Sequence, residues 1–357
     1  MSSITQTAAA IPPKTSAVSL SYVLNRAAAI LMVAGFGWVV PLVKLLSGHA
    51  PRQQLAELWR QLGVPVAAIA VFLALWAVLA PKVQTSLGAV PGPVEVWAQV
   101  GNLVADHQAE RAKQAAFYER QAKRNAEAKA EGGETKTRKF TGKPTYLDQI
   151  VTSLETVFMG FMLATLVAVP LGVMCGLSKT VNAALNPLIQ IFKPVSPLAW
   201  LPIVTMVVSA SYVSQDPMFE KSFLNSAITV TLCSMWTTLI NTAIGVASID
   251  KDLVNVGRVL NLSLGTTIRK LVLPSALPYI FTGLRLSLGV GWMVLIAAEM
   301  LAQNPGLGKF VWDEFQNGSS QSLAKIMVAV FTIGLIGFLL DRVMMAFQAM
   351  FTHSATR

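Results

Sequence analysis

The chain has 357 residues, of which 54% are hydrophobic and only 13% are charged, and its mean hydropathy is +0.55. A soluble globule of this composition would have too little polar surface to cover itself, so the composition indicates a membrane protein. The net charge of +10 does not indicate a nucleic-acid binder. No basic patch is interleaved with aromatic residues, and membrane proteins collect Lys and Arg in their cytoplasmic loops anyway.

Seven stretches are apolar and long enough, or nearly so, to cross a bilayer as helices, which takes about 20 mostly apolar residues. The first and last are short, but charged residues at their ends could reach the headgroups. The first stretch, which follows Arg26, could also be a signal peptide; no small-residue cleavage site follows directly, so we expect a retained helix. The predicted spans are 27–43, 61–81, 156–178, 194–215, 222–249, 271–298 and 326–340.

These spans predict an all-α, multi-spanning bundle of about six or seven transmembrane helices. Four regions follow along the chain. They are an N-terminal segment with one helix and a basic loop (1–63), a helix with its extracytoplasmic lead-in (64–103), a charged insertion (104–145), and a core of the remaining spans (146–350) that contains a distinctive loop at 250–274.

The short loops predict the orientation, because an excess of Lys and Arg marks the cytoplasmic side. The loops after the third and fifth spans are basic and are expected inside. The loops after the fourth and sixth spans carry more Asp and Glu and are expected outside. Alternation then places the basic stretch 44–60 inside and the N-terminus outside.

Residues 104–143 interrupt the apolar pattern with ten Lys and Arg against six Asp and Glu, and apolar residues are sparse. Glu119 and Lys123 stand at the i,i+4 spacing that supports a helix. Alternation puts this insertion outside the cytoplasm, since long loops cross the membrane largely regardless of charge. We expect a solvated helix followed by a hinge at Gly132 and Gly133, with contact to a docking partner as the alternative.

No catalytic or cofactor site is evident in the sequence. The GxxxxGK[ST] phosphate loop is absent, so the chain is not expected to hydrolyse ATP by that route. The histidines are scattered, and Cys175 and Cys233 lie in apolar runs without metal-ligand or disulfide spacing. The sequence therefore predicts a chain that is not an enzyme and binds no cofactor itself.

The loop after the fifth span carries the most information. Residues 249–278 predict a short amphipathic helix, a turn at 261–265, and a basic helix that enters the membrane, where Pro274 and Pro278 reshape its first turns. A loop that only connects two spans would not need this helix, turn and pair of prolines. A small helix of this kind suits reception in the groove of a partner protein.

This loop resembles the signature loop of ABC importer permeases, which has the form EAA, three residues, G, nine residues, I-x-L-P. The spacing is kept, although the identities differ. The EAA positions fall on Asn255, Val256 and Gly257, the G on Asn261, and the I-x-L-P positions on Leu271, Leu273 and Pro274.

The sequence that follows resembles the branch that carries nitrate, bicarbonate, taurine and other sulfonates. The similar stretches are 277–292, 297–300 and 186–202, and residues 90–93 and 304–308 look most like nitrate and bicarbonate permeases. The resemblance, which covers about 146–347, implies a type I ABC importer permease fold in the bacterial inner membrane. It implies import of a small oxyanion, with nitrate or nitrite preferred and taurine, alkanesulfonates, bicarbonate or cyanate as alternatives.

The same resemblance implies partners. They are a second permease copy, two cytoplasmic ABC ATPase subunits that use ATP and Mg, and an extracytoplasmic solute-binding protein. The loop residues that would couple the ATPases to transport are Asp252, Asn255, Val256, Gly257, Asn261, Gly265, Leu271, Leu273 and Pro274. Bulky or charged replacement of Gly257 or Gly265 is expected to uncouple ATP use from uptake. A secondary anion transporter is a more distant alternative. Such a transporter would be expected to have ionisable residues near the bilayer midplane and internal repeats, and neither is clear in this sequence.

Arg285 and Glu299 are intramembrane charges, and with Trp292 they are the candidates for the substrate pathway. The two charges lie about 21 Å apart along a helix and cannot pair with each other. Arg285 could hold a planar oxyanion through two hydrogen bonds; the alternative is that it pairs with a neighbouring helix or reaches the inner surface. Glu299 would repel an anion, so we expect gate pairing or simple exposure near the outer surface.

Overall fold

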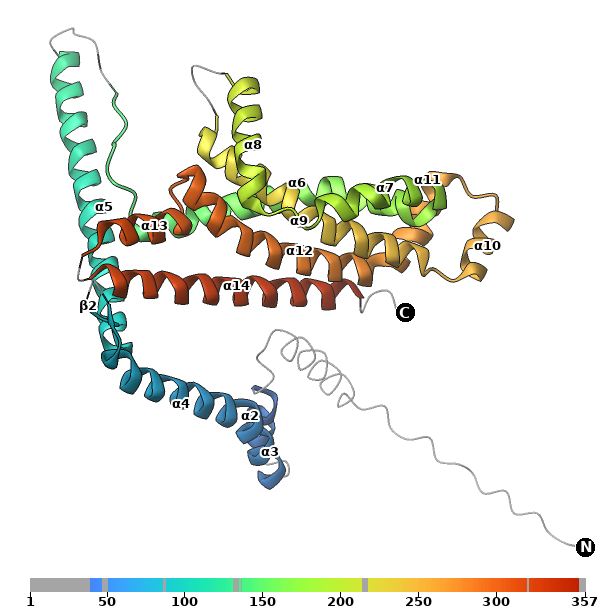
Figure 1. Cartoon of the computed structure of the whole chain (residues 1–357), viewed down its shortest axis with the longest axis horizontal. Coiled ribbons are helices and arrows are strands. Elements are labelled where there is room, and N and C mark those ends of the chain that lie inside the picture. The colour runs from blue at the N-terminus through green and yellow to red at the C-terminus, as the bar shows by residue number, and fades with distance from the viewer. Residues whose placement is uncertain are drawn as a thin grey trace, which may run out of the picture. The chain divides into compact units, whose positions relative to one another are not determined.

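The computed structural model describes residues 39–46, 51–85, 88–130, 135, 137–213, 218–319 and 321–352, and nearly all of these residues are helical (Figure 1). The only strands in these ranges, β1 and β2, pair antiparallel with Gln84 opposite Ala89. The elements are α2 (Val39–Leu46), α3 (Pro51–Leu58), η1 (Trp59–Gly63), α4 (Val64–Leu79), η2 (Ala80–Lys82), β1 (Gln84–Thr85), β2 (Gly88–Ala89), α5 (Pro93–Ala130), α6 (Tyr146–Leu177), α7 (Lys179–Phe192), α8 (Pro197–Ser211), α9 (Lys221–Ala247), α10 (Lys251–Val259), α11 (Leu264–Thr267), η3 (Ile268–Val272), α12 (Leu273–Ala302), α13 (Leu307–Asn317) and α14 (Ser322–Thr352).

The chain divides into two compact units, Met1–Ala67 and Ala68–Arg357. In the first unit, α2 and α3 occupy much of the stretch 44–60 that was expected to be a loop, so that expectation is partly wrong. The predicted first span, 27–43, lies mostly outside the described residues, as does the expected hinge at 132–133.

Five helices are long and apolar enough to cross a membrane, and a bent pair could form a sixth crossing. The all-α membrane bundle is therefore confirmed. The five helices run over Arg52–Lys82, Tyr146–Leu177, Lys221–Ala247, Leu264–Ala302 and Ser322–Phe351. The last two extend well beyond the spans predicted at 271–298 and 326–340, because the charged residues assumed to end those spans lie inside the helices.

The fourth predicted span, 194–215, is wrong as a straight helix. Its apolar residues form α8, which has 15 residues and makes an angle of 104° with α7. A helix of that length rises about 22 Å, which is less than the roughly 30 Å hydrocarbon core. Pro194 and Pro197 lack backbone donors at the break, and the Ser196 hydroxyl caps α8 by accepting a hydrogen bond from Leu198 N.

Helices α6 and α9 pack side by side and run in the same direction. Along α6, Gly160, Gly172 and Gly176 lie against Val230, Thr242 and Val246 of α9 in that order, and at each of them an added Cβ would fall within 3 Å of α9. Small residues at such contacts let helices approach closely in membranes. Because α6 and α9 are parallel, the bent pair α7 and α8 must return the chain across the bundle, so it counts as one crossing.

Helix α12 lies against the same helix α9 but runs in the opposite direction. Gly283 faces Thr238, and Gly291, later in α12, faces Ser234, earlier in α9. Helix α14 is antiparallel to α12 in turn, since Arg285 pairs with Asp341 and Trp292 bonds to Ile333. Within the second unit, the loop at 250–274 and the ends Leu177 and Ala247 therefore share one end of the bundle, which we call the loop end.

The opposite end, which we call the arm end, holds the start of α6, helix α13 and the long helix α5. The aromatic rings of Tyr146 and Phe310 are 4.8 Å apart there, in a buried cluster that also contains Val96 and Leu103 of α5. Helix α5 crosses this end of the bundle and continues past it (Figure 1). The insertion and the loop at 250–274 thus lie at opposite ends, as the alternation of spans predicted.

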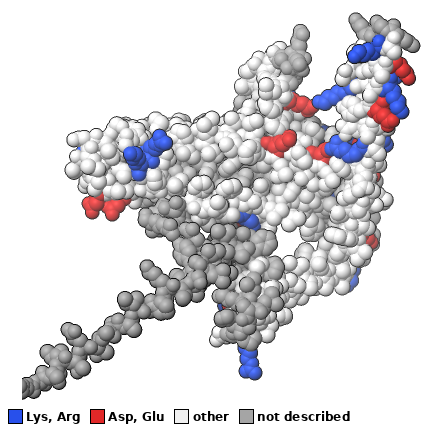
Figure 2. Space-filling model, turned by 180° about the vertical axis from the view of Figure 1, so that it is seen from behind, with Lys and Arg blue, Asp and Glu red and all other residues white. Residues whose placement is uncertain are grey.

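The charged residues are also concentrated at the two ends of the bundle. Figure 2 shows that most charged side chains on this face gather over the arm end and over the loop end, and the surface between them is mostly uncharged. Exposed apolar side chains such as Leu166 and Met293, at 71% and 70%, are expected on a lipid-facing belt.

Candidate functional site

The loop at 250–274, which we call the coupling loop, folds into two short helices at a sharp turn. Asp250 caps α10, because its carboxylate accepts a hydrogen bond from Asp252 N at 2.9 Å. Asn261 ends that turn with φ 48°, in the left-handed region that Gly and Asn tolerate best. The resembling motif has Gly at this position, so the structure explains why Asn can replace it. Ser263 then caps α11.

Helix α10 is packed against the helix that leads into the membrane. Gly257 is the contact point, since a Cβ there would lie 2.9 Å from Leu271 Cδ1 of η3. Leu271, Leu273 and Pro274 belong to a continuous helical run from Leu264 to Ala302 that widens into a π turn at η3. Pro274 has no backbone N–H to complete an ordinary turn there. Helix α10 thus contacts the helical run that continues into α12.

The outer surface of the coupling loop is apolar although it is exposed. Val256, Val259 and Leu260 are 50%, 80% and 63% exposed, and with Asp252 and Asn255 they line a shallow hollow of about 290 Å³. Exposed apolar patches are common at protein–protein interfaces. Gly265 is also exposed, and open space surrounds it, so a small side chain fits there without strain.

Arg285 is paired with Asp341 of α14. Its Nε and one terminal nitrogen donate to the two carboxylate oxygens at 2.5 and 3.1 Å. Both side chains are about one third exposed. The interpretation that Arg285 pairs with a neighbouring helix is confirmed, and a free guanidinium for an anion is not what the structure contains.

Glu299 is completely buried, so the expectation of simple exposure is wrong. Ser153 Oγ of α6 donates to its two carboxylate oxygens at 2.9 and 2.8 Å, and Gly308 N donates at 3.0 Å. Ser153 Oγ in turn accepts from Leu307 N at 2.8 Å. Glu299 therefore fastens the turn between α12 and α13 onto α6.

The tight turn beside Glu299, residues 303–308, depends on two glycines. A Cβ at Gly306 would overlap the Glu299 carboxylate, and a Cβ at Gly308 would overlap the backbone oxygen of Ile296. Asn304, also buried, donates to Thr156 Oγ1 of α6 at 3.1 Å. We call residues 299 to 308, with Ser153 and Thr156, the carboxylate knot.

Trp292 lies between α12 and α14 and is 5% exposed. Its indole Nε1 donates to the Ile333 carbonyl at 3.0 Å, and Gly337 leaves room for the ring. These contacts describe a packing residue that holds two helices together, and they give no support to a place in the substrate pathway.

Three residues that matter here were missed from the sequence: Asp341, Ser153 and Asn304. Asp341 carried a signal, because it is a charged residue directly after the last apolar stretch, 326–340, but it was assigned to the helix end. Ser153 carried none, since a single Ser near a span is commonplace, and Asn304 was noted only as part of the resembling stretch 304–308, not for a contact. Among the described residues, no group of three or more His, Cys, Asp or Glu could hold a metal.

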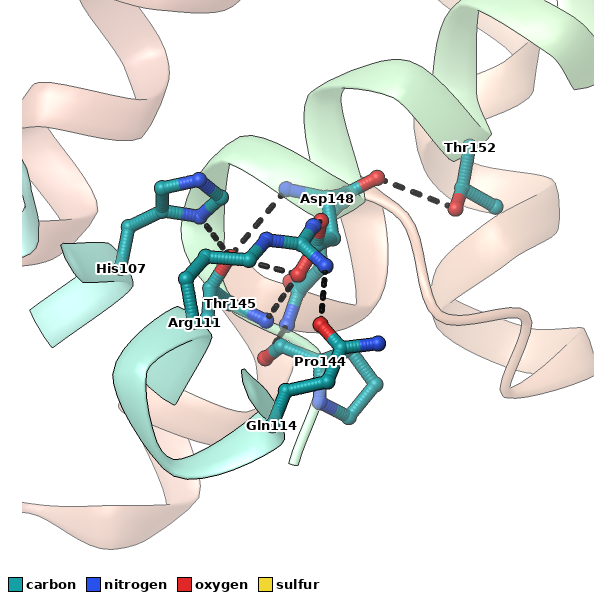
Figure 3. Close-up of polar contacts among 8 residues, drawn as sticks. His107, Arg111, Gln114, Pro144, Thr145, Asp148 and Thr152 are labelled. Carbon is teal, nitrogen blue, oxygen red and sulfur yellow. Dashed lines mark hydrogen bonds and ion pairs between the residues drawn. The ribbon is translucent and has the colours of Figure 1, made fainter. Parts of the chain in front are cut away.

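At the arm end, α5 is tied to the first turn of α6 (Figure 3). Thr145 and Asp148 form a capping box, with Thr145 N donating to Asp148 Oδ2 at 3.1 Å. From α5, Arg111 forms an ion pair with Asp148, and His107 Nδ1 lies 2.7 Å from Thr145 Oγ1. Arg111 also donates to Gln114 at 2.8 Å. Residues of the insertion thus make direct polar contacts with the residues that cap α6.

Comparisons with known proteins identify a family and several relatives of this chain. The family model of the binding-protein-dependent transport system inner membrane component matches residues 168–355. The nitrate import permease protein NrtB of Synechococcus elongatus is 38% identical over 194 residues, 54% of this chain and 66% of the relative. The bicarbonate transport system permease protein CmpB of the same organism is 38% identical over 195 residues, 54% of this chain and 65% of the relative. The chain thus spans just under two thirds of these relatives.

A longer match exists with the nitrate import permease protein NrtB of Synechocystis sp., which is 33% identical over 278 residues, 78% of this chain and 85% of the relative. Among solved structures, an amino acid ABC transporter with histidines aligns with 13% identity and a TM-score of 0.43, over 58% of this chain and 93% of that chain. The family match over most of the helical core and the apolar helices agree. This multi-pass inner-membrane chain belongs to the family of binding-protein-dependent transport system inner membrane components.

Proposed function

We propose that this chain is the permease subunit of an ATP-driven importer of a small oxyanion, with nitrate as the first candidate and bicarbonate as the second. The observation that carries the proposal is the coupling loop. It presents an exposed apolar helix, α10, at one end of the bundle, and Gly257 packs that helix against Leu271 below it.

In this proposal α10 is received by a cytoplasmic ATPase subunit, which binds and hydrolyses ATP with Mg. The permease supplies two packings, one open to each side, and closure of the ATPases favours one of them. The continuous run from Leu264 to Ala302 is the lever, since it joins the coupling loop to the carboxylate knot at the other end. The chain itself takes no catalytic part.

The full assembly in this proposal contains two permease copies, two ATPase subunits and one extracytoplasmic solute-binding protein. The family description supports a binding protein. A two-fold symmetric pair of permeases is the simplest closed arrangement that gives two ATPases equivalent docking sites.

Nitrate and bicarbonate are proposed because the relatives named above are nitrate and bicarbonate permeases. Because the Arg285 guanidinium is already paired with Asp341, we do not propose it as the group that selects the anion. Discrimination between oxyanions then belongs mainly to the binding protein. Taurine and other sulfonates remain the alternative substrates to be tested.

The test is uptake into proteoliposomes that contain the permease together with its candidate ATPase and solute-binding protein. Nitrate, bicarbonate and taurine are supplied separately as labelled substrates with ATP inside. We expect ATP-dependent uptake of nitrate that requires the binding protein. Uptake of taurine alone would reassign the substrate, and uptake driven by an ion gradient without ATP would overturn the proposal.

Docking of the ATPase can be tested by cross-linking. A Val259→Cys permease, with the new thiol on the exposed face of α10, is expected to cross-link to the ATPase with a short bifunctional maleimide. An Ala126→Cys permease, with its thiol at the opposite end of the second unit, is the matched control. Equal cross-linking of both variants, or of neither, would contradict the assigned role of the coupling loop.

A further inference from the structure

The insertion forms a braced arm rather than a loose loop. The return segment 137–145 lies back along α5, with Arg138 N donating to Gln121 Oε1 at 2.8 Å and Phe140 N donating to Tyr118 Oη at 3.3 Å. The rings of Phe117 and Phe140 are 5.5 Å apart. We call α5 from residue 104 onward, together with 137–145, the arm. Figure 1 shows it extending past the bundle.

The base of the arm is joined to the core by a continuous set of polar contacts. Arg111 and His107 hold Asp148 and Thr145, which cap α6 (Figure 3). The next turns of α6 carry Ser153 and Thr156, which bind Glu299 and Asn304 of the carboxylate knot. On α6, Asp148 at the base of the arm and Thr156 at the carboxylate knot are thus separated by about two helical turns.

The free part of the arm is basic, and its described residues form no apolar face. Of the 104–143 stretch, ten residues are Lys or Arg and six are Asp or Glu. Arg120, Lys123 and Arg124 are all exposed, and the largest apolar rings of the arm pack on one another. A helix that lies in a membrane surface needs one strongly apolar side. The arm lacks one, so its chemistry fits the acidic surface of a soluble protein.

We propose that the arm is the docking site for an acidic surface of the solute-binding protein, and that the Arg111–Asp148 pair passes this docking to the carboxylate knot. The inference rests on the proposed function, which supplies the binding protein as partner. The family match at 168–355 leaves the arm outside it, so the proposal concerns a part of the chain to which that match assigns nothing. The arm stands at the end of the second unit opposite the coupling loop, where a partner other than the ATPase can dock.

The first experiment reverses the charge of the arm. The complex of permease and ATPase in nanodiscs is assayed for ATP hydrolysis with and without the binding protein, for the wild type and for Arg120→Glu/Lys123→Glu/Arg124→Glu. We expect an unchanged basal rate and at least a tenfold higher binding-protein concentration for half-maximal stimulation. Single reversals provide a matched pair: Arg124→Glu should show part of this effect, and Lys82→Glu, an exposed cation outside the arm, should show none.

The second experiment swaps the ion pair at the base of the arm. Arg111→Asp and Asp148→Arg should each bind the binding protein as the wild type does but lose most of its stimulation of ATP hydrolysis. The double variant, which restores opposite charges, should recover it. Recovery distinguishes transmission from simple damage to the cap of α6, because a damaged cap would not be repaired by the second change.

The outcomes separate this inference from the proposed function. If the wild-type complex shows no ATPase activity that depends on the binding protein, the proposed function fails. If the triple reversal leaves stimulation unchanged, the docking inference is wrong. If that reversal abolishes binding to phosphatidylglycerol vesicles and leaves stimulation intact, the arm is a membrane-surface element and the inference is equally wrong.

Discussion

At the scale of single residues, the two intramembrane charges are held in different ways. Arg285 is neutralised by a charge on another helix, whereas Glu299 has no cation partner in the described chain and is held by hydroxyl and backbone donors. A buried acceptor that loses its donors costs about 1–3 kcal/mol, and a charge left alone in the membrane costs more. Loss of Asp341, or of the donors that bind Glu299, is therefore expected to destabilise the protein.

The carboxylate knot gives one prediction. Gly308→Ala should lower the melting temperature of the purified permease, because the added methyl group would overlap the backbone oxygen of Ile296 and push the turn away from Glu299. We expect the free energy of unfolding to fall by about 1–3 kcal/mol, which is typical of overpacking. Gly289→Ala, in α12 with open space around it, is the control and should leave the melting temperature unchanged or higher. Equal effects of the two substitutions would contradict the role of the knot.

The Arg285–Asp341 ion pair gives a second prediction. Arg285→Gln and Asp341→Asn should each reduce the thermal stability of the permease, because each leaves one charge unpaired. The double variant should be destabilised by less than the sum of the two, which a double-mutant cycle measures. If the double variant is folded but has lost uptake that the single Asp341→Asn variant keeps, Arg285 contacts the substrate after all.

At the scale of elements, the coupling loop acts through contact between two helices. Helix α10 rests on η3 through Gly257, and η3 continues into α12, so these short pieces and a membrane span form one lever. The bend between α7 and α8 is built from equally few residues. Pro194 and Pro197 break the backbone ladder, and Ser196 restores a cap immediately.

The lever gives a third prediction. Gly257→Val should uncouple transport, because its Cβ would lie 2.9 Å from Leu271 Cδ1, and the larger side chain would displace Leu271 and tilt α10 away from the span. We expect ATP hydrolysis to continue while uptake falls at least fivefold in proteoliposomes. Gly265→Ala should transport normally, since open space surrounds that position. Normal transport by the Gly257→Val variant would contradict the proposed role of this contact in coupling ATP hydrolysis to transport.

At the scale of the whole second unit, the direction of each helix fixes which loops share an end. Because α6 and α9 are parallel and α12 and α14 alternate after them, the arm and the coupling loop cannot lie at the same end. Helix packing therefore separates the two ends without any count of Lys and Arg in loops, which was ambiguous for the basic insertion.

Sidedness gives a fourth prediction. In spheroplasts with an intact inner membrane, a membrane-impermeant maleimide should label a cysteine placed at Ala126 and should label one placed at Val259 only after permeabilisation. The native Cys175 is buried and Cys233 is half-buried, so the parent chain gives a low background. Protection of the Ala126 variant would place the arm in the cytoplasm and would also remove the binding protein as its partner.

Hydropathy and spacing alone determined that the chain spans a membrane, which stretches form most of its helices, and where the coupling loop lies. These features are local, because each depends on the composition of about 20 consecutive residues or on one short motif. The tertiary structure decided what the charges do. Asp341 stands 56 positions from Arg285, and Ser153 stands 146 positions from Glu299, so no local pattern could pair them.

The tertiary structure also decided the bend of α7 and α8 and the grip of the arm on α6. An apolar stretch interrupted by prolines is compatible with either a kinked span or a broken one, and the packing of the neighbouring helices chooses between them. The ion pair between Arg111 and Asp148 arises only because the return segment 137–145 brings the end of the insertion back beside its beginning.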